Sequence, residues 1–95
     1  MSAPSAVATV QVDDARVRVT EWRFAPGAAT GWHRHAYDYV VVPLTTGRLK
    51  LVEAEGVVRH AELRAGVAYF RAAGVEHDVI NDNPFELVFI ETEIK

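Results

Sequence analysis

Three of the four histidines in this sequence lie in two short segments whose residue types can bind a metal ion. His33 and His35 are two residues apart, and His77 lies much later in the chain. In an extended strand, residues two apart point to the same side and lie about 6.5 Å apart along the chain. Such a pair of imidazoles can chelate one ion, and a third ring can complete a facial set. The sequence therefore predicts one divalent transition metal ion held by His33, His35 and His77.

The identity of the metal is left open by these residues. The chain has no cysteine, so any metal must be held by nitrogen and oxygen. Imidazole nitrogens suit Fe, Mn, Co, Ni, Cu and Zn, and affinity alone does not select among them. The alternative is that the three histidines are hydrogen-bonded residues inside a protein without metal. His60 lies outside both segments and is expected on the solvated surface.

Other catalytic chemistries find no support in the sequence. The only serines are Ser2 and Ser5, near the N-terminus, and the absence of cysteine leaves a catalytic triad without a nucleophile. No glycine-rich loop precedes a helical pattern, so phosphate binding of the dinucleotide or P-loop kind is not expected.

Length and composition predict one small domain over residues 1–95, with residues 1–6 as a flexible tail. The chain is 49% apolar, enough for a core, but a core of this size gains from the additional burial that a homodimer provides. The net charge is −3 and basic residues are scattered, so neither nucleic acid nor membrane is expected as a partner. No signal-peptide pattern opens the sequence, which predicts a cytoplasmic protein.

Period-two patterning runs through most of the chain and predicts an all-β fold without helices. Glycine, proline, asparagine and aspartate clusters separate the extended segments. The expected strands are Val7–Val12, Arg16–Phe24, Gly31–Val42, Gly47–Glu53, Val57–Leu63, Val67–Phe70, Glu76–Ile80 and Phe85–Ile94. So many short strands must close into a barrel or form a two-sheet sandwich to bury their apolar face.

The second expected strand changes the phase of its apolar pattern. Val17 and Val19 share one parity, whereas Trp22 and Phe24 occupy the other. A β-bulge near Thr20, or a strand that passes between sheets, produces such a change. The alternative is that Trp22 faces a partner subunit.

The two histidine segments resemble the two conserved motifs of the cupin superfamily. The matching residues are Gly27, His33, His35 and Gly47 in the first motif, and Gly66, Gly74, His77 and Asn81 in the second. This resemblance implies a jelly-roll β-barrel (double-stranded β-helix) with a metal ion inside its mouth, and often a dimer.

Two positions depart from the cupin pattern. Ala72 replaces a proline of the second motif, and no glutamate stands where the first motif has its carboxylate ligand. Tyr39 and Val40 occupy that place, and the nearest carboxylate, Asp38, has the parity that points out of the barrel. Three neutral imidazoles leave the ion's charge uncompensated, which lowers affinity and increases Lewis acidity. Tyr39 is predicted to act as a hydrogen-bond partner for metal-bound water or substrate, not as a ligand.

The function implied by this resemblance is metal-dependent oxygenase chemistry on a small dicarbonyl- or carboxylate-type substrate, similar to cupin dioxygenases with three-histidine centres. Tyr37, Trp32 and Arg71 are candidate substrate contacts. The alternative reading places Tyr37 and Trp32 in the barrel wall or an interface, and Arg71 on the solvated face. Cupins also include non-catalytic proteins, so a small-molecule binding or sensing module, with or without metal, is the alternative function. A metal-free structural dimer is the third.

Overall fold

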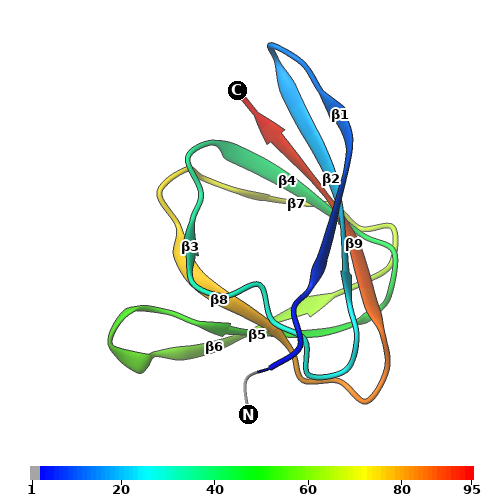
Figure 1. The fold of residues 1–95 in the computed structure, drawn as a ribbon, viewed down its shortest axis with the longest axis vertical. Coiled ribbons are helices and arrows are strands. Elements are labelled where there is room, and N and C mark those ends of the chain that lie inside the picture. Colours follow the sequence, from blue (N-terminus) through cyan, green and yellow to red (C-terminus); the bar gives the residue numbers. More distant parts are fainter. Residues whose placement is uncertain (1–2) are drawn as a thin grey trace.

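The computed structural model describes residues 3–95, which form two antiparallel sheets that face each other as a jelly-roll β-barrel (Figure 1). The five-stranded sheet has the order β1-β2-β9-β4-β7, and the four-stranded sheet has the order β3-β8-β5-β6. The strands are β1 (Val7–Asp13), β2 (Val17–Phe24), β3 (His33–Arg34), β4 (Asp38–Pro43), β5 (Gly47–Val52), β6 (Val58–Leu63), β7 (Tyr69–Arg71), β8 (Glu76–Asn81) and β9 (Leu87–Ile94). A short 3-10 turn, η1 (Ala54–Gly56), joins β5 to β6, and residues 3–95 contain no α-helix. The all-β jelly-roll prediction is confirmed.

Alternating burial along the strands explains why the sequence forms this barrel. In β8, His77, Val79 and Asn81 are buried, whereas the residues between them are only half-buried. β4 alternates in the same way. The inward residues pack into one core that includes Phe24, Leu49, Leu63, Leu87 and Phe89. Burying each such side chain contributes roughly 1.5–3 kcal/mol, so this parity holds His77 on the inner face.

The predicted strand Gly31–Val42 is wrong as a single element, because the chain changes sheets within it. β3 pairs with β8 in the four-stranded sheet, whereas β4 pairs with β7 and β9 in the other sheet. His35 lies in the crossing between them and belongs to neither strand. Side chains from both sheets therefore meet near this crossing.

The irregularity predicted near Thr20 in the second strand lies in the neighbouring strand instead. β2 pairs with β9 without a break, whereas β1 shifts register between Val10 and Val12, opposite Thr20 and Val19. Trp22 lines the cavity at the barrel mouth and packs against the core, on the same face as Phe24. The change of phase arises because β2 turns Thr20, Trp22 and Phe24 toward the barrel interior.

The N-terminal segment is held more firmly than predicted. The Ala29 N–H donates to the Pro4 carbonyl, and the Ala6 N–H donates to the Ala29 carbonyl, at 2.8 and 2.9 Å. Residues 4–6 therefore pair with the folded domain, in contrast to the predicted flexible tail. Residues 1 and 2 of that tail lie outside the described residues.

Within residues 3–95, no helix is long and apolar enough to cross a membrane.

Candidate metal centre

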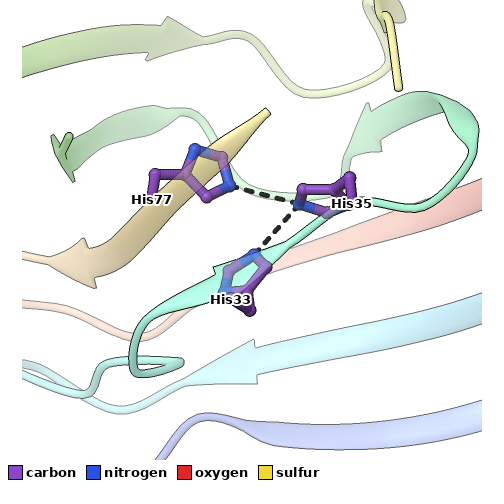
Figure 2. Close-up of side chains that lie close together, drawn as sticks. All are labelled: His33, His35 and His77. Carbon is purple, nitrogen blue, oxygen red and sulfur yellow. Dashed lines mark hydrogen bonds between the residues drawn. The ribbon is translucent and has the colours of Figure 1, made fainter. Parts of the chain in front are cut away.

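The structure brings His33, His35 and His77 together, although the three residues come from different elements. His33 in β3 pairs directly with His77 in β8, and His35 follows β3 in the crossing to β4. The Nε2 atom of His35 lies 3.0 Å from that of His33 and 3.1 Å from that of His77. Figure 2 shows the three rings converging with these nitrogens toward one another.

Backbone hydrogen bonds hold the crossing that carries His35. The His35 N–H donates to the Val75 carbonyl at 2.9 Å, and the Gly74 N–H donates to the His35 carbonyl at 2.8 Å. Gly74 has a φ of 96°, a left-handed conformation that favours glycine. This glycine lets the turn before β8 clamp His35 beside His77.

The contacts of His33 decide which of its nitrogens carries the proton. Its Nδ1 atom lies 2.9 Å from the Gly31 carbonyl oxygen and 3.1 Å from the Thr30 hydroxyl. A carbonyl oxygen only accepts hydrogen bonds, so the ring must donate from Nδ1. In the neutral ring, Nε2 then presents a lone pair to the other histidines.

A buried carboxylate decides the same question for His35. The Nδ1 atom of His35 lies 3.2 Å from Oε1 of Glu91, and the indole N–H of Trp22 donates to Oε2 of Glu91 at 2.6 Å. Glu91 is only 5% exposed. Because a carboxylate accepts, His35 donates from Nδ1 and also presents its Nε2 lone pair to the cluster.

The donor set therefore fits a metal ion. Two Nε2 lone pairs that face each other at 3.0 Å repel unless a cation lies between them. Neighbouring ligands on one ion are about 3 Å apart when bonds of about 2.1 Å meet near a right angle. Burial and the neighbouring His33 and His35 lower the pKa of His77 to about 4, so its ring is neutral at pH 7 and available as a ligand.

The three histidines border a cavity of about 360 Å³ inside the barrel mouth. Tyr37, Tyr39 and Arg71 line it, as expected for candidate ligand contacts. Trp32 does not line it and is 54% exposed, so the structure gives its predicted substrate contact no support.

Tyr39 lies beside His35 on the inner face of β4. The two rings stack with centroids 4.0 Å apart and an interplanar angle of 19°. Burial, together with the negative charge of Glu91, raises the pKa of the Tyr39 phenol well above its usual value. The phenol is therefore a hydrogen-bond donor at neutral pH.

Asp38 and His60 lie outside the histidine cluster, as the sequence predicts. Asp38 is exposed and accepts a hydrogen bond from the Ala73 N–H at 2.8 Å, away from the histidines. His60 is exposed, with Nε2 3.5 Å from the Asp82 carboxylate. Neither side chain belongs to the histidine cluster.

Sequence reasoning missed Glu91, although the sequence contains a signal for it. Leu87, Phe89 and Glu91 share one parity of the final strand and are all buried. A glutamate in phase with apolar residues is a candidate buried polar group, and such groups need hydrogen-bond partners. The partners, Trp22 and His35, come from other elements, which parity alone does not reveal.

Comparison with known proteins agrees with this geometry. The cupin domain family model matches residues 20–92. The chain is 70% identical over 92 residues to the "Beta-alanine degradation protein BauB" of Pseudomonas aeruginosa, covering 97% of this chain and 96% of that protein. It is 58% identical to a cupin domain of known crystal structure from Bordetella pertussis Tohama I, with a TM-score of 0.96 and coverage of 100% and 98%.

A more distant structure shows the fold alone. A double-stranded β-helix protein from Klebsiella pneumoniae is 20% identical, with a TM-score of 0.77 and coverage of 99% of this chain and 80% of that one. Because the family model spans most of the sequence and the barrel carries the histidines of both motifs, this chain belongs to the cupin domain family.

Proposed function

We propose that this protein is a metal-binding small cupin that acts as a metal-dependent oxygenase on a small dicarbonyl- or carboxylate-type substrate. The observation that supports the metal-binding part is the facing pair of Nε2 atoms on His33 and His35, 3.0 Å apart, with an oxygen acceptor beside the Nδ1 atom of each ring. His77 adds a third neutral ring. These three residues would hold one divalent ion of Fe, Mn, Co, Ni, Cu or Zn.

A bound ion of this kind supplies Lewis acidity and open coordination positions for substrate oxygens. The chain supplies the surroundings. The walls of the cavity beside the histidines include Val41 and Phe89, whose apolar side chains can pack against the carbon atoms of a substrate. The Tyr39 phenol stays protonated and can donate a hydrogen bond to a carbonyl or carboxylate oxygen.

Arg71 supports an anionic substrate. It lies opposite Tyr39 in the β4–β7 ladder, so both side chains leave the sheet on the same side. Its guanidinium carbon is 5.2 Å from the centre of the Tyr69 ring, and no acidic residue among residues 3–95 forms an ion pair with it. A guanidinium without a carboxylate partner at a cavity wall suits a substrate carboxylate.

The name of the Pseudomonas aeruginosa relative supports the same substrate class. β-Alanine carries its amine on the third carbon, when the carboxylate carbon is counted as the first. Converting that amine to a carbonyl leaves a short 3-oxo carboxylate, whose two oxygenated groups can both bind one metal ion. Such a compound combines the dicarbonyl and carboxylate features that the site fits.

The proposed reaction class is cleavage by dioxygen of the carbon–carbon bond between one carbonyl carbon and the central carbon. One oxygen atom enters the new carboxylate and the other enters the new carbonyl. The substrate supplies the four electrons that reduce dioxygen, so no other reductant is needed.

Oxygen uptake tests this proposal. Protein loaded anaerobically with Fe(II) is mixed with short 3-oxo carboxylates, uncharged 1,3-diketones and β-alanine, and dioxygen consumption is followed. We expect uptake with one of the first two classes, and its loss in His77→Gln. Substrate binding without uptake under any metal loading favours the alternative, a non-catalytic binding or sensing cupin that uses the same cavity.

Arg71→Gln separates the two substrate classes. Because it removes the positive charge at the cavity wall, we expect KM for a 3-oxo carboxylate to rise and KM for an uncharged diketone to stay nearly constant. Equal changes for both classes would contradict recognition of a carboxylate by Arg71.

The cytoplasmic location also stays a prediction of the sequence.

A further inference from the structure

Glu91 is a buried carboxylate in an otherwise apolar part of β9. It is 5% exposed and follows the buried Leu87 and Phe89 on the inner face of the strand. A buried charge is unfavourable unless it is hydrogen-bonded or paired. Within residues 3–95, no lysine or arginine forms an ion pair with Glu91. Its stabilisation must therefore come from other groups.

Each carboxylate oxygen of Glu91 has its own partner. Oε2 accepts the indole N–H of Trp22 at 2.6 Å, and Oε1 lies 3.2 Å from Nδ1 of His35. Trp22 stands on β2, which is the strand next to β9 in the sheet, so the indole holds the carboxylate from the side. The other oxygen is left facing His35.

From this arrangement we propose that Glu91 is a positioning residue for the metal centre: it holds the Nδ1 proton of His35, directs the Nε2 lone pair to the metal, and supplies negative charge through the ring. This inference rests on the proposed metal binding. Trp22 in turn orients Glu91.

The negative charge of Glu91 also changes the expected electronics of the centre. The sequence predicts three neutral imidazoles without an acidic partner, because the glutamate ligand of the first cupin motif is absent. A carboxylate bonded to the far nitrogen of a histidine ligand makes that ligand more basic. Glu91 therefore compensates part of the ion's charge without binding the ion, because the His35 ring lies between them. It stands on β9, a strand outside both motifs.

Glu91→Gln, Trp22→Phe and their combination separate charge from hydrogen bonding. A glutamine side chain has one accepting oxygen and one donating NH2 group. In E91Q, the NH2 group must face either the Trp22 indole N–H or the His35 Nδ1–H, which are both donors. Adding W22F removes the indole, so the amide oxygen can accept from His35 without the charge.

Glu93→Gln is the matched control. Glu93 lies two residues further along the same face of β9 and also lines the cavity, but its carboxylate lies 3.7 Å from Arg18 and not beside a histidine. The control loses the same charge from the same cavity without touching His35.

Two measurements are made on each variant. Competition with a chromophoric chelator gives the affinity for Co(II) and Zn(II), and 15N–1H NMR of the metal-free protein gives the tautomer of the His35 ring. We expect E91Q to bind metal about 10- to 100-fold more weakly than wild type, and E93Q to bind like wild type. The E91Q/W22F protein should keep the Nδ1–H tautomer yet still bind more weakly, because the charge is absent.

Equal metal affinities for E91Q and E93Q would overturn the inference, as would an Nε2–H tautomer of His35 in the metal-free wild type. If wild type shows the Nδ1–H tautomer but binds neither metal, the proposed function fails and the orienting role of Glu91 stands. Should E91Q not fold, E91Q/W22F and the wild-type tautomer carry the comparison.

Discussion

At the level of single residues, the chemistry depends on which nitrogen of each imidazole carries the proton. Gly31 and Glu91 each accept from an Nδ1 atom, on His33 and His35 respectively. The two Nε2 atoms are left as acceptors 3.0 Å apart. Fixed tautomers reduce the freedom that metal binding would otherwise have to remove, because the lone pairs already point to one place.

Tyr39→Phe tests the role assigned to the phenol. The phenyl ring keeps the stacking on His35, so we expect metal affinity to change less than about threefold. Substrate binding or turnover should fall several-fold, because a neutral hydrogen bond is worth about 1 kcal/mol. Chelator competition and steady-state kinetics, or ligand titration for a binding protein, give the two numbers.

For this variant, loss of the metal would contradict the assignment and make Tyr39 a ligand or an essential support of His35. Unchanged kinetics with intact metal would show that the hydroxyl does not contact the substrate.

The histidines were predictable because their identity and spacing are local properties of the chain. The carboxylate was not predicted, since the contact between Glu91 and His35 joins residues far apart in the sequence. The first cupin motif has its glutamate near the position of Tyr39. The structure provides one from the last strand, on the other side of the ring.

At the level of elements, Asn81 fastens the end of β8 to the end of β2 and to the loop before β9. Its fully buried side-chain amide donates to the carbonyls of Phe24 and Phe85 at 3.1 and 2.8 Å. Its backbone carbonyl accepts from the Gly27 N–H at 2.8 Å. Because His77 lies on the same strand and the same face, this fastening fixes the strand that carries the third histidine.

Asn81→Ala should lower the free energy of unfolding by at least about 2 kcal/mol. The substitution leaves buried carbonyl oxygens without donors, and each such group costs about 1–3 kcal/mol. Urea denaturation measures the change. The control is Asp82→Ala, which removes an exposed ion pair to Arg48 and should cost less than about 1 kcal/mol. Similar losses for both variants would contradict a fastening role for Asn81.

The sequence predicted which residues face the barrel interior more accurately than where each strand begins and ends. Burial alternates from His33 through His35 and Tyr37 to Tyr39 even where the chain leaves one sheet for the other. Periodicity therefore predicts one long strand, because it records which side faces inward and not which strand is the hydrogen-bonding neighbour. The β1 irregularity has the same origin: the phase change in β2 was visible, but the extra residue lies in its partner strand.

At the level of the whole molecule, β1 is the least buried part of the barrel. It forms one edge of the five-stranded sheet (Figure 1), and all seven of its residues are exposed. Val7, Val10 and Val12 are 58%, 54% and 44% exposed. An open edge with apolar side chains favours pairing with another chain. We propose that this edge contributes to the homodimer predicted for so small a core.

Val10→Lys tests this dimer by sedimentation equilibrium. We expect wild type to be dimeric at micromolar concentrations and V10K to be shifted toward monomer, because a lysine opposes pairing at a strand edge. The control is Val67→Lys, a valine of similar exposure (58%) just before β7 at the opposite edge of the same sheet. A monomeric wild type, or equal effects of the two substitutions, would contradict the proposed interface.

The whole proposal for this molecule depends on a metal ion at the three histidines. The most direct measurement is elemental analysis of protein purified without an affinity tag, dialysed against Co(II) or Zn(II) and then freed of excess metal. We predict that wild type and the surface variant His60→Gln retain a single ion per chain, whereas His77→Gln retains far less. A wild type that retains no metal, or a His77→Gln protein that retains as much as wild type, would contradict the three-histidine centre.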